Sequence, residues 1–300
     1  MASGSTARID PAELRALAAQ GHPTPISIRG WLRLIRRVGG LLLSLLVYVP
    51  LHYLWRVLAY GSPFPKLFLA QAAWIVGARV EITGTPLRRD VFFISNHVSW
   101  VDILALAGAS GTAFVAKAEL SKVPVISWLC KLNRTVYVQR EARGDVAGQI
   151  NALRESLADN WSVTVFPEGT TTDGHSLLPF KTSLLKVLEP PPPGVLVQPV
   201  LLDYGAVGEE IGWVGEEGGL NNAKRILARK GTFPVRIRYL EPFSPEEHNG
   251  RKEIGSRARA EIEAALLEAL GKPLREFAHD VGPVRYSAGK SEDTKPPLDS

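Results

Sequence analysis

Residues 91–106 read VFFISNHVSWVDILAL, and this order of residue types predicts a strand, a polar turn and a helix. The first four residues are large and apolar, which is typical of a strand buried on both faces of a sheet. The last four resume an apolar helical pattern after the polar residues between them. Because α/β sheets place ligands at the carboxyl ends of their strands, we expect a functional site at residues 95–102.

The candidate catalytic pair in this turn is His97 and Asp102. Five positions on one helix separate two side chains by about 140°, so the pair can meet only if His97 precedes the helix and Asp102 lies in its first turn. The Asp102 carboxylate would then accept the Nδ1–H of His97 and leave Nε2 free as a base. The alternative is an ordinary helix start, with Asn96 or Ser99 as its cap and His97 merely exposed.

Two further segments supply polar residues in comparable positions. Residues 163–170 read VTVFPEGT, an apolar strand that Pro167 ends, and Gly169 lets the backbone come close to a ligand. Glu168 would then lie at a strand end, although an ordinary surface turn explains it equally well if it stands alone. Lys117 and Arg140 follow other apolar runs and are possible phosphate contacts, or simply solvated charges.

Short β-rich runs alternate with helical patterns between residues 90 and 271, and this alternation predicts an α/β sandwich with a mixed, largely parallel sheet flanked by helices. The clearest helical patterns cover residues 145–159 and 253–270. The predicted strands are 91–95, 112–116, 135–138, 162–166, 195–201 and 235–240.

The N-terminal part of the chain combines basic charge with apolar sequence. The residues before Ser95 include eleven Lys or Arg and four Asp or Glu, which accounts for more than the whole net charge of +5. Residues 38–55 carry no charge, but an 18-residue helix reaches only about 27 Å, just short of a bilayer core, and a second apolar stretch at 67–80 is shorter. A membrane-associated helical hairpin in one leaflet, a transmembrane helix and a buried core all remain open.

Composition divides the 300 residues into four parts and excludes some classes of protein. We expect a flexible N-terminus at 1–27, a membrane-associated helical region at 28–82, a catalytic domain at 83–275 and a flexible tail at 276–300. The single cysteine, Cys130, excludes a disulfide framework and a multi-thiolate zinc site. Positive charge beside an apolar hairpin favours an anionic membrane surface over nucleic acid.

At this point the sequence resembles the glycerolipid acyltransferase superfamily, whose best-known members are 1-acyl-glycerol-3-phosphate acyltransferases. The resemblance rests on four blocks that occur in the same order and spacing. They are residues 96–102 with their His-x4-Asp pattern, 116–120 followed by Arg140, 166–170 followed by 180–181, and 197–200. The preceding basic and apolar region also resembles the membrane-binding helices of the family.

The resemblance implies an acyltransferase domain with His97 as the general base and Asp102 orienting it. A lysolipid hydroxyl would attack an acyl thioester, with acyl-CoA or acyl carrier protein as the co-substrate and no cofactor or metal ion. The substrate-binding residues that it implies are Asn96, Ser99, Lys117, Arg140, Glu168, Gly169, Thr170 and Lys181, with phosphate contacts for the three cationic ones. The expected location is the cytoplasmic face of the inner membrane, and the oligomeric state is unknown.

One departure from the family pattern bears on the acceptor. Many lysophosphatidate enzymes have Arg directly after Glu-Gly-Thr, whereas this chain has Thr171. Residues 171–174 and 213–216 resemble instead the branch that acylates lyso-ornithine lipids. We therefore expect conversion of 1-acyl-sn-glycerol-3-phosphate to phosphatidic acid, with lyso-ornithine lipid as the alternative acceptor. A non-catalytic membrane protein, a metal hydrolase and a nucleic-acid module are weaker alternatives. A protein without catalysis has no need of the His97 and Asp102 pair. These two residues, with no further clustered His or Cys, give little support to a metal site, and the positive charge lies beside an apolar hairpin, which does not favour nucleic acid.

Overall fold

The computed structural model describes residues 11–59, 61–117, 124–133, 135–138 and 162–279. In this part of the chain seven strands form one sheet in the order β1-β7-β6-β2-β5-β3-β4. Its only antiparallel pairing among these strands joins β6 to β7, so β1 and β7 run opposite to the other five. The strands are β1 Ala78–Thr83, β2 Val91–Ser95, β3 Ala113–Lys117, β4 Val136–Val138, β5 Ser162–Val165, β6 Leu196–Asp203 and β7 Phe233–Tyr239.

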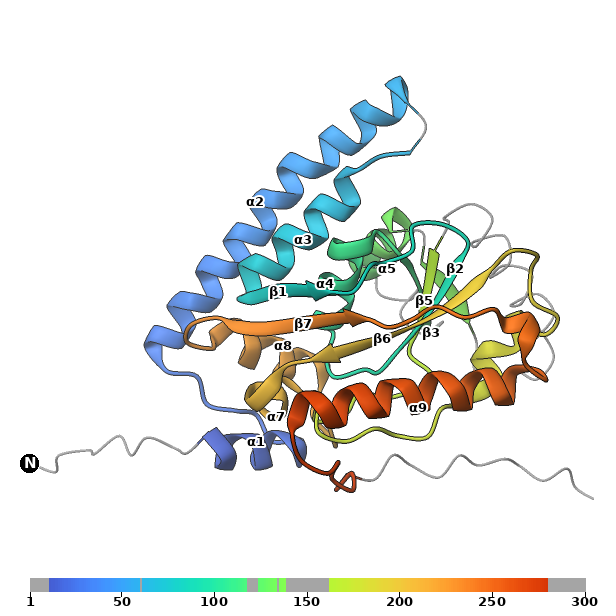
Figure 1. The fold of residues 1–300 in the computed structure, drawn as a ribbon. Coiled ribbons are helices and arrows are strands. Elements are labelled where there is room, and N and C mark those ends of the chain that lie inside the picture. The colour runs from blue at the N-terminus through green and yellow to red at the C-terminus, as the bar shows by residue number, and fades with distance from the viewer. Residues whose placement is uncertain (1–10, 60, 118–123, 134, 139–161, 280–300) are drawn as a thin grey trace, which may run out of the picture.

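Helices cover both faces of the sheet, as the alternation of strands and helices predicts. Phe92 and Ile94 pack on the side of α9, while Val91 and Phe93 pack on the side of α3, α4 and α8. Figure 1 shows α9 along one face and α2 with α3 rising from the other. The helices are α1 Pro11–Ala19, α2 Ile28–Leu58, α3 Phe64–Val76, α4 Val101–Ser110, α5 Pro124–Leu132, α7 Gly208–Ile211, α8 Gly219–Ala228 and α9 Arg251–Leu270.

The predicted fold class is confirmed, and each of the six predicted strands is present with small shifts of its ends. The predicted helix at 253–270 corresponds to α9, which begins two residues earlier. The prediction of an apolar segment over 67–80 is wrong in its last part, because α3 ends at Val76 and β1 begins at Ala78. The predicted helix at 145–159 lies outside the described residues.

Gly77 makes this change from helix to strand possible. It caps α3 with a φ of 109°, a left-handed conformation that favours glycine. A Cβ atom at this position would lie 2.9 Å from Nη2 of Arg37 and 3.3 Å from the carbonyl oxygen of Gly231. The turn therefore brings α2, α3 and the start of β7 close together.

The N-terminal hairpin consists of α2 and α3, which lie side by side in Figure 1. With 31 residues α2 is about 46 Å long, well beyond the 18-residue uncharged run. Most of its apolar side chains face outward, and Leu46 and Val57 are 73% and 82% exposed. The alternative of a buried core helix is therefore wrong for α2. It is the one helix of the described residues long and apolar enough to cross a membrane.

Residues 11–27 are not the flexible segment that we expected. Helix α1 packs against the body of the protein with Ala18 fully buried. The guanidinium of Arg15 donates to the Glu209 carbonyl oxygen and lies 3.5 Å from the buried carboxylate of Glu217. Glu217 in turn accepts two hydrogen bonds from Arg225, both 2.9 Å long. This buried charge cluster, which connects segments 200 residues apart, explains why local composition does not reveal that α1 is anchored.

Candidate active site

Two neighbouring parallel strands bring the main polar segments together. Strand β2 pairs with β5 in a register that places Ile94 opposite Val165, so the turns that follow them leave the same edge of the sheet side by side. The first turn contains His97 and the second contains Glu168. His97 and Glu168 are 71 residues apart in the sequence, but in the structure the His97 N–H donates a hydrogen bond of 2.7 Å to Oε1 of Glu168.

His97 and Asp102 form the predicted pair. His97 lies in the loop before α4, and Asp102 lies in the first turn of that helix. Nδ1 of His97 is 2.7 Å from Oδ2 of Asp102. The carboxylate is fully buried, whereas the imidazole side chain is 19% exposed. With Nδ1–H donating to the carboxylate, Nε2 carries the lone pair, and no hydrogen bond within the described residues uses it.

Asp102 is held by three further donors. Its Oδ2 accepts hydrogen bonds from the backbone N–H groups of Val98 at 2.7 Å and Ser99 at 3.0 Å, and its Oδ1 accepts one from the Tyr204 hydroxyl at 2.5 Å. Together with His97, four donors therefore surround one buried carboxylate. Such a set fixes both the position of the carboxylate and the orientation of the imidazole that it binds.

Tyr204 is a site residue that the sequence did not indicate. It follows directly after β6, the other neighbour of β2, and its side chain is 1% exposed. Burial, followed by the nearby Asp102 carboxylate, raises the pKa of Tyr204 well above its usual value, so its hydroxyl remains a donor. Its place at the end of a strand beside β2 is the only signal that could have pointed to it.

The plane of the imidazole is set by Phe166. The two rings stack with centroids 4.1 Å apart and an interplanar angle of 12°, and Phe114 stacks on the far side of Phe166. The backbone carbonyl of His97 also accepts hydrogen bonds from the backbone N–H and the hydroxyl of Thr172, at 2.8 and 3.2 Å. Contacts from β5 and from the loop after it therefore limit the movement of His97.

Glu168 connects two loops through its two side-chain oxygens. Its side chain is buried, and its two oxygens accept hydrogen bonds from the backbone N–H groups of His97 and Leu178, at 2.7 and 2.9 Å. Burial raises the pKa of Glu168 to about 8, against the opposing effect of these two hydrogen bonds. The predicted acceptor contact of Glu168 stays a prediction, and in the structure its carboxylate joins the His97 loop to the loop that contains Leu178.

Asn96 and Ser99 make hydrogen bonds within the protein, and their predicted contact with substrate stays a prediction. The Asn96 amide exchanges two hydrogen bonds with the backbone of Leu202, at 2.9 and 2.8 Å, and so ties the turn to β6. The Ser99 side chain is fully buried, and its hydroxyl accepts a hydrogen bond from the Val101 N–H at the start of α4. This bond resembles the capping role considered as the alternative.

The structure describes most, but not all, of the other predicted binding residues. Gly169 and Thr170 are partly exposed in the turn after Glu168, and Gly169 has a φ of 77°. Lys181 lies against this turn, because a Cβ atom on Gly169 would be 2.8 Å from its Nζ. Lys117 is the last residue of β3. Arg140 lies outside the described residues, and the binding roles of Gly169, Thr170, Lys117 and Lys181 stay predictions.

The arrangement is suited to removing a proton from a neutral group. An exposed imidazole nitrogen is available, and the positive charge that the ring acquires is stabilised by a buried, fixed carboxylate. Ser95 and Ser99 are both buried, and Cys130 lies within α5. The site geometry therefore favours a base that activates an incoming hydroxyl.

Comparison with known proteins agrees with this chemistry. A family model described as acyltransferase matches residues 79–203. The lyso-ornithine lipid O-acyltransferase of Rhizobium meliloti is 33% identical over 258 residues, which cover 80% of this chain and 88% of that protein. Its counterpart in Brucella abortus is 32% identical, with 79% and 97% covered. The 1-acyl-sn-glycerol-3-phosphate acyltransferase of Neisseria gonorrhoeae is 34% identical over 117 residues, 39% of this chain and 46% of that protein.

The fold has a counterpart among solved structures. The 1-acyl-sn-glycerophosphate acyltransferase PlsC from Thermotoga maritima superposes with a TM-score of 0.59 over 80% of this chain and 96% of that one, at 22% sequence identity. This likeness concerns the arrangement of the sheet and its helices.

The sheet and the strand-end pair of His97 and Asp102 define an enzyme of the acyl-transfer class. The chain belongs to the glycerolipid acyltransferase superfamily, as the alignments at 33% and 32% identity over 80% and 79% of the chain show. The family resemblance inferred from residues 96–102 and 166–170 is therefore confirmed.

Proposed function

We propose that the protein is a membrane-associated O-acyltransferase that moves an acyl group from a thioester to the hydroxyl of a lysolipid, with His97 as the general base. The observation that carries this proposal is the 2.7 Å contact between Nδ1 of the partly exposed His97 and the buried Asp102. A positioned base of this kind contributes about 10²- to 10⁴-fold to the rate.

The reaction follows from the free Nε2 of His97. This atom takes the proton of the lysolipid hydroxyl as its oxygen attacks the thioester carbonyl carbon. The resulting tetrahedral intermediate collapses when the carbon–sulfur bond breaks. The thiolate of CoA or acyl carrier protein leaves and receives the proton from the imidazolium. One ester bond is formed, one thioester bond is broken, and His97 returns to its starting state.

The first candidate acceptor is 1-acyl-sn-glycerol-3-phosphate, which would become phosphatidic acid. Relatives in two Neisseria species carry the name of this activity and align with 38% to 39% of the chain. Lys181 is a cation beside the partly exposed Gly169 turn, which supports an anionic head group in this region.

A second candidate acceptor is lyso-ornithine lipid. Four relatives that align with 67% to 84% of this chain carry the name lyso-ornithine lipid O-acyltransferase. Thr171 favours the same acceptor. It stands where many lysophosphatidate enzymes have Arg, it is buried, and its hydroxyl donates to the Trp213 carbonyl oxygen. A neutral, buried residue at this position offers no contact to a phosphate monoester.

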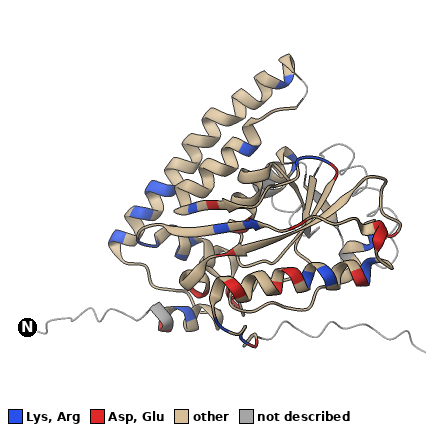
Figure 2. Cartoon of the chain, in the orientation of Figure 1, with Lys and Arg blue, Asp and Glu red and all other residues tan. Residues whose placement is uncertain are grey.

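The hairpin supports action at a membrane surface, and we propose the cytoplasmic face of the inner membrane as the location. Its exposed apolar residues suit the interior of a leaflet, and the basic residues near the start of α2 suit anionic head groups. Figure 2 shows these basic residues gathered at the end of α2 that adjoins the sheet.

The acceptor is identified by incubating the purified full chain with acyl-CoA or acyl carrier protein thioester and one lysolipid at a time. The panel contains 1-acyl-sn-glycerol-3-phosphate, lyso-ornithine lipid and lysophosphatidylcholine, and products are measured by mass. We expect one acyl group to be added to one of the first two lipids. Thioester hydrolysis without an acylated lipid, or no turnover with any acceptor, contradicts the proposal.

A further inference from the structure

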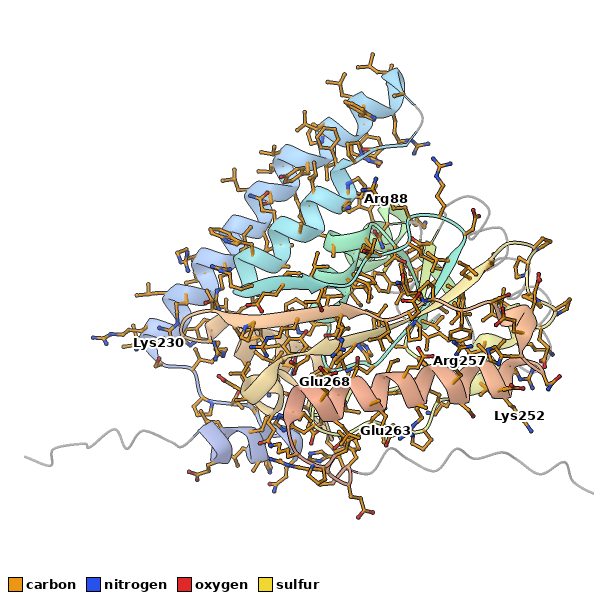
Figure 3. The ribbon with its side chains drawn as sticks, viewed as in Figure 1. Arg88, Lys230, Lys252, Arg257, Glu263 and Glu268 are labelled. Carbon is orange, nitrogen blue, oxygen red and sulfur yellow. The ribbon has the colours of Figure 1, made fainter. Side chains whose placement is uncertain are left out.

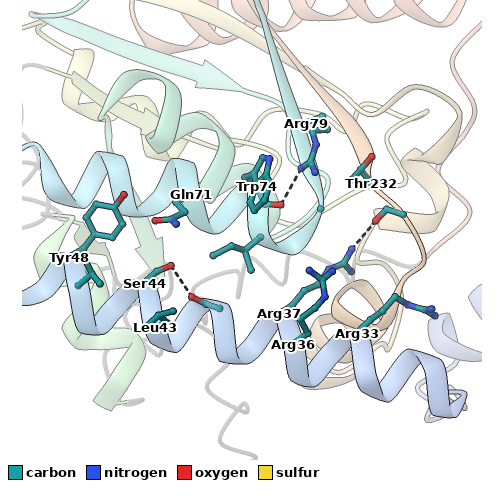
Figure 4. A pocket seen from close by; sticks show the side chains of 15 residues that line it. Arg33, Arg36, Arg37, Leu43, Ser44, Tyr48, Gln71, Trp74, Arg79 and Thr232 are labelled. Atoms are coloured by element: carbon teal, nitrogen blue, oxygen red, sulfur yellow. Dashed lines mark hydrogen bonds between the residues drawn. The ribbon is translucent and has the colours of Figure 1, made fainter.

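A groove with a volume of about 670 Å³ lies between α2 and α3, well separated in sequence from the catalytic turns. Figure 4 shows that Arg33, Arg36, Arg37 and Arg79 gather at one end of it, while Leu43 and Tyr48 lie towards the other. We call it the arginine groove. It thus combines a cationic end with an apolar remainder, which is the pattern of a phospholipid.

The positive charge of the arginine groove is not neutralised locally. None of the described residues that line it is Asp or Glu, and neither α2 nor α3 contains an acidic residue. The neighbouring positive charges affect the pKa of Arg37. Burial, and after it the neighbouring guanidiniums, lower the pKa of Arg37. The groups that lower it are Arg36, Arg33, Arg229 and Arg79, in decreasing order of effect.

The four arginines differ in what they are free to bind. The buried Arg37 donates to the backbone carbonyl oxygens of four residues at the end of α8 and before β7, so its role is structural. Arg33 donates through Nε to the Ala228 carbonyl oxygen. Arg79 donates through Nη1 to the Trp74 and Ala78 carbonyl oxygens, and its guanidinium lies over the Trp74 ring with Cζ 5.1 Å from the centroid. Arg36 is exposed and has no hydrogen bond or ion pair within the described residues.

Gly40 keeps the groove open. It lines the groove, and a Cβ atom there would meet the Ile75 side chain at 3.4 Å. The adjacent Gly39 does not line the groove, and a Cβ atom there would meet nothing within 4 Å. Two neighbouring glycines of the same helix therefore face a cavity and open space, respectively.

The groove also opens at the same edge of the sheet as the catalytic pair. Gly77, Gly231 and Thr232 line it at the beginnings of β1 and β7. Since β1 and β7 run opposite to β2, their first residues lie at the edge where β2 ends. A lipid in the groove and an acceptor lipid at His97 can therefore belong to one leaflet.

We propose that the arginine groove binds an anionic membrane phospholipid, with its phosphate between Arg36 and Arg79 and an acyl chain along α2 towards Tyr48. This lipid is a bound component of the membrane-associated protein and differs from the acceptor, so the inference goes beyond the proposed function. The guanidinium fork suits phosphate oxygens, and the uncharged walls of α2 and α3 suit the chain.

The electrostatic part is tested by native mass spectrometry of the full chain in mild detergent with phosphatidylglycerol or phosphatidylcholine added. We expect one phosphatidylglycerol to be retained in preference to phosphatidylcholine. The double variant Arg36→Gln with Arg79→Gln should weaken retention by roughly tenfold or more, at about 1 kcal/mol for each cation. The matched control is Lys252→Gln with Lys272→Gln, which removes two exposed charges that do not line the groove. Lys252 lies at the start of α9, far from the hairpin (Figure 3).

A second test changes the shape of the groove but not its charge, and so distinguishes specific binding in the groove from general attraction between a basic protein and anionic lipid. Gly40→Leu fills the groove without any change of charge and should abolish retention, whereas Gly39→Leu should retain the lipid as the wild type does. Equal retention by these two variants overturns the proposal, as does displacement of the bound lipid by glycerol phosphate or CoA alone. Acyl transfer in detergent should be unchanged in Gly40→Leu, so the outcome is independent of the proposed function.

Discussion

At the scale of single residues, the carboxylate of Asp102 determines how the His97 imidazole is held. It is fully buried and accepts hydrogen bonds from His97, Tyr204 and two backbone N–H groups. An unsatisfied buried acceptor costs about 1–3 kcal/mol, so each of these donors contributes to holding the group in place. The orientation of His97 therefore depends on the residues that hold Asp102 in place.

Tyr204 allows this dependence to be measured. In Tyr204→Phe the ring is kept and one donor to Asp102 is lost, so the carboxylate holds the His97 imidazole less firmly. We expect kcat to fall about tenfold, which is equivalent to about 1.4 kcal/mol, with little change in KM.

A purely structural role for Tyr204 gives a different result. In that case Tyr204→Phe lowers the free energy of unfolding and leaves the kcat of the folded protein unchanged. Tyr239→Phe is a suitable control, because Tyr239 is also buried and its hydroxyl does not bond to Asp102.

Glu168 predicts a pH dependence of stability. Its folded pKa of about 8 lies above the usual 4.5, so the folded protein binds this proton more tightly than the unfolded chain does. Between these values the folded state carries more protons, and the free energy of unfolding should fall as pH rises, by up to about 1.4 kcal/mol per pH unit.

Glu168→Gln removes this titration but also weakens one of the two loop contacts, because an amide nitrogen cannot accept a hydrogen bond. We expect the variant to be less stable at pH 5 and to lack the part of the decline towards pH 8 that Glu168 causes. Urea unfolding at several pH values measures the difference. A decline of the same steepness in wild type and variant contradicts the raised pKa of Glu168.

At the residue scale, the sequence predicted those parts of the site that are close together in the chain. The five-residue spacing of His97 and Asp102 allowed a single geometry for a contact, and the structure has that geometry. Tyr204 and Phe166 reach the pair from β6 and from the end of β5. Their contacts depend on strand order, which local patterns do not contain. For the same reason, the sequence did not indicate that Glu168 is buried.

At the scale of elements, apolar runs identified the buried strands but not β1, which lies at one edge of the sheet. Strand β2 is buried throughout, and its first four residues are all apolar. Strand β1 is largely exposed after Val80 and alternates charged with apolar residues, so it resembled the end of the apolar segment before it. The left-handed turn at Gly77 marks the boundary, and a single glycine in an apolar stretch is a weak signal.

The length of α2 is a second feature that the sequence pattern did not predict correctly. The uncharged run of 38–55 suggested a helix too short to cross a bilayer, but α2 extends from Ile28 to Leu58. Arg33, Arg36 and Arg37 lie within the helix, because charged residues are good helix formers and do not end a helix. Charge therefore marked the edge of the apolar surface, whereas the ends of the helix are set by the Ser27 cap and by Ala59.

At the scale of the whole molecule, the hairpin and the catalytic pair are parts of one arrangement. Arg37 joins α2 to the end of α8 and to the loop before β7, and Gly108 of α4 allows α3 to approach so closely that a Cβ atom would lie 2.7 Å from Ala70 Cα. Since Asp102 lies in the first turn of α4, the hairpin is packed directly on the helix that carries the carboxylate partner of His97. This packing places the membrane-facing surface in a fixed relation to the site.

The role of His97 as the base is tested most directly by single-turnover acyl transfer with His97→Ala in the full chain. We expect the rate of lysolipid acylation to fall at least 100-fold, with vesicle binding and the free energy of unfolding close to those of the wild type. His248→Ala is the matched control, because His248 also pairs with a carboxylate, Glu253, but lies near the start of α9 and should leave the rate unchanged. An acylation rate in His97→Ala within a few fold of the wild-type rate contradicts the mechanism.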